Sequence, residues 1–458
     1  MPSELADHIA TISVIDTHSH MAGDFAWDGP DAPDILGDLF GWYSSSDLIV
    51  AGASRAAVDQ LRDRTDEDLE GRFAGIAAAW DAIRFTGYGE AVRIAARDLY
   101  GIEELRADTI RAGQARLEAW QRPGGCLTLL RDRAKLDHVQ TDLGLDTIAL
   151  PRSSAPFFLR DLSVLRFAVG AVDDPVLEAA TGVTIRDLAT VRDVMETMFA
   201  RYAPLSIALK SQHAYVRTLA WQQRSDADAE RALQGVLAGG PGSNDPQSAA
   251  RICLGDWCLG QVAELASRYQ LPIKLHTGYL AGTAAEGTAM PIDRLRAGHL
   301  ASLLMEYPDT QFVLMHIAYP YRDEMIALAK HFGNVTVDLC WAWALNPFAT
   351  KDFVRQFLHA VPLTRLFAFG DDTSTPSMAY AYAVQMRRWL TRTLEEEITD
   401  GFMTVPQAMD VATRLLRDNQ LATFDIAGRQ QAVLAATESN ERFSWPWPYR
   451  YDAHVAGS

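Results

Sequence analysis

The chain alternates between short runs of apolar, often β-branched residues and longer stretches in which apolar positions recur at helical spacing. Nearly continuous apolar strands separated by helices predict a parallel sheet that is covered on both faces. Eight such strands predict an α/β fold of the (β/α)8 TIM-barrel type, in which functional groups gather at the carboxyl ends of the strands. The eight runs are 11–18, 136–144, 162–170, 204–211, 271–278, 310–318, 334–341 and 365–372.

Two regions exceed what a bare barrel needs. Residues 24–135, between the first and second predicted strands, have helical periodicity and predict a helical insertion that starts at the carboxyl end of the first strand. Residues 373–458 predict C-terminal helices followed by a tail. We therefore expect residues 1–458 to form one barrel domain with a large insertion and a C-terminal extension.

Charge and composition narrow the classes of partner. The 458 residues carry a formal net charge of −17, which disfavours nucleic acid and anionic membranes as partners. No apolar run approaches the roughly 18 residues that cross a bilayer, and the N-terminal stretch lacks the pattern of a signal peptide. The four cysteines form no CxxC motif and are expected to be reduced thiols. These features favour a cytoplasmic protein that acts on a small molecule.

Polar side chains of the metal-ligating or titratable kind stand where five of the apolar runs end. His18 and His20 lie two residues apart, so on a strand they would point to the same face. Because the strand ends of a closed barrel meet at one mouth, these groups predict a metal site with several nitrogen and oxygen ligands. The groups are His18 and His20, Lys210, His276, His316, and the pair Asp371–Asp372.

The motifs at these ends resemble those of the amidohydrolase superfamily, above all its amidohydrolase-2 branch. They are DTHSH, KLHTG, FVLMHIAYPYRDE, NVTVDLCW and FAFGDD, in this order. The length and the helical insertion also resemble uronate isomerases, and IALKSQHAYVRTL is similar to a segment of nodulin/FluG-type proteins. The resemblance implies one or two divalent ions, zinc first and manganese or iron as alternatives, bound by His18, His20, His276 and Asp372.

The resemblance also implies roles for the remaining groups. Asp372 is preferred to Asp371 as the ligand, because the family carries a small hydroxyl residue at the position of Asp371. Asp372 would also take a proton from water during catalysis. His316 would bind a second ion or face the substrate as an acid or electrophile. Lys210 would be a carboxylated lysine that bridges two ions or, alternatively, a substrate-binding or structural ammonium.

Three residues are candidates for substrate binding. Arg217 has the bidentate geometry that suits a substrate carboxylate, with a solvated surface arginine as the alternative. Tyr215 lies beside it in the sequence, and Trp341 follows the seventh run, where its ring would line the pocket.

A charged pair is expected inside the barrel. Asp16 lies two residues before His18 and Lys274 two residues before His276, so both side chains should point inward. The two strands are odd-numbered and share a side-chain layer. Since an unpaired buried charge is costly, we expect Asp16 and Lys274 to pair beneath the metal site.

The resulting functional hypothesis is a metal-dependent hydrolase that cleaves a C–N or related bond of a small, carboxylated molecule. The same ligands also suit a uronate-isomerase-like isomerase or a non-oxidative decarboxylase. A barrel that binds or scaffolds without turnover is the third alternative. Because barrels of this superfamily often associate through their outer helices, a homo-oligomer is expected.

Overall fold

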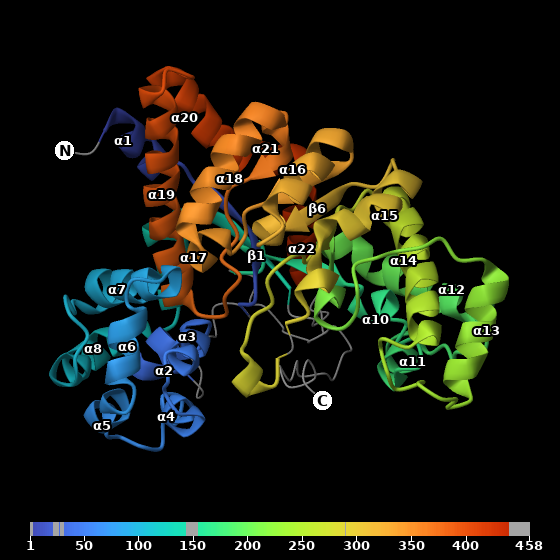
Figure 1. Ribbon diagram of the computed structural model, residues 1–458, viewed down its shortest axis with the longest axis horizontal. Coiled ribbons are helices and arrows are strands. Elements are labelled where there is room, and N and C mark those ends of the chain that lie inside the picture. The colour runs from blue at the N-terminus through green and yellow to red at the C-terminus, as the bar shows by residue number, and fades with distance from the viewer. Residues whose placement is uncertain (1–2, 22–26, 28–31, 143–153, 289, 439–458) are drawn as a thin grey trace.

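The computed structural model describes residues 3–21, 27, 32–142, 154–288 and 290–438. Within them, eight parallel strands follow one another in sequence order around a barrel (Figure 1). Backbone hydrogen bonds from Thr17 N to Phe369 O (3.2 Å) and from Asp372 N to His18 O (2.9 Å) join the last strand region to the first. The predicted TIM barrel is therefore confirmed. The strands are β1 (Val14–Ser19), β2 (Leu136–Thr141), β3 (Phe158–Ser163), β4 (Ser206–Ser211), β5 (Ile273–Leu275), β6 (Phe312–Met315), β7 (Val335–Asp338) and β8 (Leu366–Phe367).

The third strand lies earlier in the chain than predicted. The apolar run 162–170 contains only the last residues of β3, and its remainder forms the short buried helix α10 (Leu165–Ala168). An apolar run of this length is equally suited to a buried strand and a buried helix, which is why the pattern misplaced the strand. Six of the other seven strands lie within the predicted runs, and β1 extends one residue beyond its run.

Helices cover the outside of the barrel, with α1 before the first strand and the others after later strands. Those after β3 and β4 include the long helix α14, which packs against α10 and α13. No helix among the described residues is long and apolar enough to cross a bilayer. The helices on the outside of the barrel are α1 (Glu4–Thr11), α11 (Pro175–Thr181), α12 (Leu188–Tyr202), α13 (Asp226–Leu237), α14 (Ala249–Tyr269), α15 (Ala301–Glu306), α16 (Arg322–His331), α17 (Ala342–Leu345) and α18 (Pro347–Ala360).

The segment between β1 and β2 folds into a helical group beside α17 and the C-terminal helix α19 (Pro376–Thr399), shown in blue in Figure 1. Its contact with the barrel is close: a Cβ on Gly87 would lie 2.0 Å from the Ala344 carbonyl oxygen. The Gln385 side chain also donates to the Gly87 carbonyl at 2.9 Å. The helices of this group are α2 (Ile35–Phe40), α3 (Ser44–Val50), α4 (Arg55–Gln60), α5 (Leu69–Ala74), α6 (Ala77–Ile83), α7 (Gly87–Tyr100), α8 (Ala107–Trp120) and α9 (Gly125–Leu127).

The C-terminal helices return along the barrel and close its amino end. Phe424 and Ile426 pack in one buried cluster with Ile15 and Phe367 of the first and last strands. The rings of Phe367 and Phe424 are 5.6 Å apart. After α19 come α20 (Val405–Thr413), α21 (Asn419–Thr423) and α22 (Ile426–Glu438), and the expected tail from residue 439 onward lies outside the described residues.

Candidate metal centre

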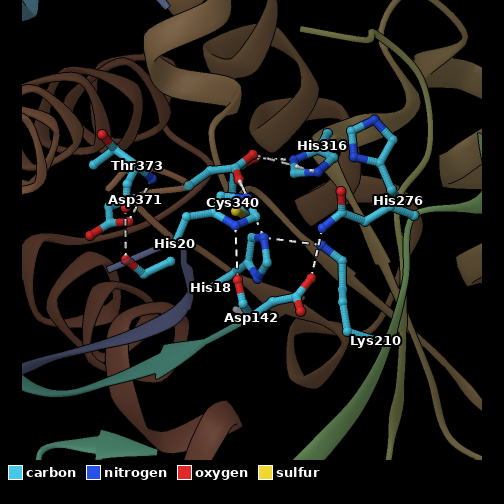
Figure 2. A network of polar contacts seen from close by, with 12 residues as sticks. His18, His20, Asp142, Lys210, His276, His316, Cys340, Asp371 and Thr373 are labelled. Carbon is cyan, nitrogen blue, oxygen red and sulfur yellow. Dashed lines mark hydrogen bonds and ion pairs between the residues drawn. The ribbon is translucent and has the colours of Figure 1, made fainter. Parts of the chain in front are cut away.

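Three of the predicted ligands converge at the mouth of the barrel. The Nε2 atom of His20 lies 3.0 Å from Asp372 Oδ1, and the Nε2 atom of His18 lies 3.3 Å from the same oxygen. The ligand atoms of these three residues all fall within 4.8 Å of one another. Figure 2 shows His18 and His20 in the network of polar side chains at this mouth. His18 belongs to β1, whereas Asp372 follows β8, so the closure of the barrel brings them together. We call His18, His20 and Asp372 the first ligand cluster.

Hydrogen bonds orient the histidine rings toward the centre. The Nδ1 atom of His20 donates to the Asp142 carbonyl at 2.9 Å, and that of His316 donates to the Cys340 carbonyl at 2.9 Å. In His316 this places the proton on Nδ1 and leaves the Nε2 lone pair for a ligand. In His20 burial would lower the pKa, but the nearby Asp372 carboxylate outweighs burial and raises the pKa, so a metal ion bound at Nε2 would displace a proton. Burial lowers the pKa of His316 to about 4 and that of His18 well below its usual value. Both rings are therefore neutral, the form that binds metal ions.

The two adjacent aspartates point in different directions. Burial alone would raise the pKa of Asp372, but the neighbouring His18 and His20 rings outweigh it and hold that pKa well below its usual range. Asp371 instead lies against Asp16, and burial together with that neighbouring carboxyl raises the pKa of Asp371 well above its usual value. The structure therefore directs an ionised Asp372, and not Asp371, at the histidines.

The donor set fits a divalent ion. Two imidazole nitrogens and a carboxylate oxygen are ligands that zinc, manganese and iron accept. Among the described residues, the buried His316 Nε2 atom has no hydrogen-bond partner. An orphaned nitrogen of this kind is costly unless something binds it. The residues present therefore fit a divalent ion in their chemistry and in their burial.

Lys210 and His276 lie beside the first ligand cluster. The Lys210 ammonium is buried, and its Nζ atom lies 3.0 Å from His18 Nε2. The ring of His276 is 4.3 Å from that of His316, but its Nε2 atom lies 2.9 Å from the Tyr279 carbonyl oxygen. The structure thus places both residues at the barrel mouth without bringing His276 into the first ligand cluster.

Two of the three predicted substrate-binding residues lie near these histidines. The Tyr215 ring is 4.8 Å from the His276 ring, and its hydroxyl accepts a hydrogen bond from the Ala281 amide. Trp341 meets the His316 ring edge-on at 5.4 Å and stacks on Tyr43 at 4.6 Å. Their rings therefore lie next to these histidines, and their contact with a substrate stays a prediction.

Arg217 does not occupy the predicted position. Its side chain is fully buried, and its Nη1 atom donates to Asp256 Oδ1 of α14 at 2.8 Å. Arg224 binds the other oxygen of Asp256. The guanidinium thus serves an ion pair between a loop and a helix, and the prediction that it binds a substrate carboxylate is wrong. Asp256 lies in the middle of a helix, where the sequence pattern gave no sign of a buried charge.

The predicted Asp16–Lys274 pair is also wrong, although both side chains are buried inside the barrel as expected. Lys274 Nζ donates to both oxygens of Asp161 at 2.9 Å, and also to Gln140 Oε1 and the Thr17 carbonyl. Asp161 belongs to β3, which shares the layer of odd-numbered strands. The predicted third strand starts at residue 162, four residues after β3 begins, and therefore leaves Asp161 outside the strand.

Sequence reasoning also missed groups around the cluster. Trp42, in the segment after β1, donates from its indole Nε1 to the Asp372 carbonyl at 3.2 Å. Cys340 follows β7 and lies against His316 and Asp372. Its position at the end of an apolar run was the signal that could have identified it. The carbonyl of Asp142, which orients His20, carries no signature in the sequence.

The backbone is strained where β6 ends. His316, Ile317 and Ala318 have φ values of 68°, 50° and 48°, a left-handed turn of three consecutive non-glycine residues. Asp372 and Trp341 also have positive φ, at 51° and 63°. Such conformations cost about 1–3 kcal/mol each and cluster at functional sites. The turn fixes the direction in which the His316 ring leaves the strand.

Residues 153–384, about half of the chain, match the profile of the family described as Amidohydrolase. The match includes Lys210, His276, His316 and Asp372, and begins after His18 and His20. Protein fluG of Emericella nidulans is 27% identical over 248 residues, which are 52% of this chain and 28% of that protein. The chain thus aligns with less than a third of that relative's length.

Solved structures share the whole fold. Uronate isomerase from Thermotoga maritima superposes with a TM-score of 0.74 at 15% identity, covering 92% of this chain and 96% of its own. Glucuronate isomerase from Caulobacter crescentus gives 0.73 at 16%, covering 92% of each chain. A protein from Lactobacillus casei described as a metal-dependent hydrolase gives 0.63 at 16%, covering 95% and 100%. At these identities the likeness concerns the fold.

Proposed function

The chain belongs to the amidohydrolase family, and from that premise we propose that it is a hydrolase dependent on a divalent metal, cleaving a C–N or related bond of a small molecule. The observation that carries the proposal is the convergence of His18, His20 and Asp372 at the barrel mouth. Family membership implies a divalent ion, and these three residues would hold it. Such an ion supplies Lewis acidity and lowers the pKa of water toward about 7.

The carboxylate of Asp372 provides the proton acceptor. Its Oδ1 atom faces His18 and His20, whereas its Oδ2 atom lies 3.8 Å from His316 Nε2. An ionised carboxylate in this position can take a proton from water and return it to a leaving amine. His316 is neutral with its proton on Nδ1, so its Nε2 atom offers a lone pair and not a hydrogen bond to a carbonyl. This state favours a basic or ligating role for His316 over that of an electrophile.

Lys210 provides positive charge beside the reacting bond. The lone pair of His18 Nε2 can serve either the Lys210 ammonium or a metal ion, since both approach the same atom. Binding of the ion would therefore free the ammonium for an oxygen of the substrate. With Arg217 engaged by Asp256, we propose Lys210 as the cation that binds a substrate carboxylate.

A second candidate function is sugar-acid isomerisation. The specific observation in its favour is that two isomerases share the fold over 92% of this chain, which includes the helical segment between β1 and β2. Aldose–ketose isomerisation needs a proton moved between neighbouring carbons, and Asp372 and His316 are acceptors of the right kind.

A substrate panel separates the two functions. The metal-loaded protein and its Asp372→Asn variant would be assayed against N-acyl amino acids, simple amides and lactones, and in parallel against uronates and aromatic acids. We expect the metal-loaded protein to hydrolyse a C–N or ester bond, and the variant to do so at least a hundredfold more slowly. Conversion of a uronate without any hydrolysis would replace the hydrolase by the isomerase. Bound metal with no turnover on either panel would contradict both and favour a binding barrel.

A further inference from the structure

The two oxygens of Asp372 face two different sets of ligand atoms. One is the first ligand cluster, which meets Oδ1. The other is formed by His316 Nε2, Cys340 Sγ and Asp372, whose ligand atoms also lie within 4.8 Å of one another. All three residues of this second ligand cluster are buried. A carboxylate with one oxygen toward each of two clusters has the arrangement of a bridge.

The His316 ring is held so that one nitrogen faces the second ligand cluster. Its Nδ1 atom is anchored on the Cys340 carbonyl, and the left-handed turn at its own backbone fixes the direction of the ring. Its Nε2 atom is completely buried and has no hydrogen-bond partner among the described residues. An unpartnered nitrogen in this setting is the atom that an additional ligand would satisfy.

The Cys340 sulfur is fixed between the ends of β7 and β8. The Cys340 amide donates to Asp338 Oδ1 at 2.9 Å, and the side chain is fully buried. A Cβ on Gly370 would lie 2.8 Å from the sulfur, so the chain after β8 approaches it in a way that only glycine allows. The thiol therefore has a defined position beside His316 and Asp372.

We propose that His316, Cys340 and Asp372 bind a second divalent ion, and that Asp372 bridges it to the ion of the first ligand cluster. This second site rests on the proposed function only in so far as the first ligand cluster also holds an ion. One nitrogen, one sulfur and one oxygen ligand select a borderline-soft ion such as zinc over magnesium or manganese. Three protein ligands leave a position open, as in catalytic zinc sites. The Cys340 thiol gives its proton to solvent as the sulfur–metal bond forms.

This centre differs from the one that a carboxylated lysine would build. There, the bridge needs carbon dioxide and the nitrogen of Lys210. Here, the bridge is the carboxylate of Asp372, and the distinguishing ligand is the sulfur of Cys340. The two arrangements make different spectroscopic predictions, because a thiolate ligand gives cobalt a charge-transfer band that nitrogen and oxygen ligands do not.

Cobalt titration of the metal-free protein tests the proposal without any substrate. We expect two equivalents of Co²⁺ per chain and a thiolate-to-cobalt charge-transfer band. Cys340→Ser should bind one equivalent without the band, whereas Cys258→Ser should keep both. Cys258 is the matched control, because it is buried in α14 and belongs to neither ligand cluster.

Other outcomes overturn the proposal in distinguishable ways. One equivalent without the band in the unmodified protein would remove the second ion and leave the proposed function intact. Two equivalents that require bicarbonate and show no band would assign the bridge to Lys210. No binding at all would contradict the proposed function as well. If Cys340→Ser fails to fold, the presence or absence of the band in the unmodified protein still decides.

Discussion

Replacing Lys274 with methionine should strongly destabilise the fold. The Lys274 ammonium is completely buried and donates to the carboxylate of Asp161, to Gln140 and to the Thr17 carbonyl. Methionine has a similar length but neither charge nor donor. The variant therefore leaves the Asp161 carboxylate in the interior without its cation, which costs about 3–5 kcal/mol of unfolding free energy.

The unfolding free energy lost in Lys274→Met should depend on pH in a defined direction. Burial raises the pKa of Asp161, and the Lys274 charge opposes that rise. Without Lys274 the pKa of Asp161 rises further, so the folded variant holds a proton that the unfolded chain releases near pH 4. A raised folded pKa means that stability is lost as the pH increases. The difference from the unmodified protein should be smallest near pH 4 and largest at neutral pH.

Urea unfolding followed by tryptophan fluorescence measures these differences, and a double-mutant cycle identifies the partner. Asp161→Asn combined with Lys274→Met should show a coupling energy of about 1–3 kcal/mol, whereas Asp16→Asn combined with Lys274→Met should be additive within about 0.5 kcal/mol. Lys330→Met is the surface control, since this exposed lysine makes a single hydrogen bond to a backbone carbonyl. We expect its effect to stay within about 0.5 kcal/mol.

Two results would refute this reasoning. If Lys274→Met unfolds within 1 kcal/mol of the unmodified protein, the buried network does not carry the stability assigned to it. If the coupling appears with Asp16 and not with Asp161, the pairing expected from the sequence is the correct one.

Three further predictions concern other parts of the chain. Gly278→Ala should lower the free energy of unfolding by about 2 kcal/mol and weaken metal binding through His316. Gly278 has a φ of 74°, and the new Cβ would lie 2.5 Å from the backbone of the left-handed turn. An unchanged thermal unfolding temperature would contradict this prediction. Arg217→Met should cost about 2–3 kcal/mol in urea unfolding by leaving Asp256 short of one partner, with KM unchanged; a higher KM at unchanged stability would restore a substrate-binding role. A hydrogen bond from the adjacent histidine lowers the pKa of Asp137 to about 2, so its contribution is complete above about pH 4 and lost as the pH falls toward 2. Asp137→Asn should thus cost about 1–2 kcal/mol at pH 7, after allowance for solvent screening, and less at pH 3, and an equal cost at both values would show that the carboxylate charge is not involved.

The strand ends were predictable because burial on both faces leaves a strong signal. A strand covered by helices reads as a continuous apolar run, and the first polar residues after it mark the barrel mouth. This reasoning located His18, His20, His316 and Asp372 at one end of the barrel, as the structure has them. It failed at residues 162–170, because the apolar run continues from β3 into a buried helix.

The partners of buried charges were not predictable from spacing. The carboxylate that pairs with Lys274 depends on where β3 begins. The predicted strand begins a few residues later than β3 and so does not include Asp161. The ion pair of Arg217 depends on a helix that comes about forty residues later in the chain. Cys340 was set aside with the other cysteines, since a lone thiol shows its neighbours only once the barrel has closed.

The most direct test of the account is the metal content of the purified protein after exposure to zinc and removal of free ion, compared between the unmodified chain and Asp372→Asn. Asp372 is the residue that both ligand clusters share, and the amide keeps its shape while removing its charge. We expect at least one equivalent of divalent metal per chain in the unmodified protein and at least a tenfold loss of affinity in the variant. Equal metal content in the two proteins, or none in the unmodified protein, would contradict the claim that the barrel mouth is a metal centre.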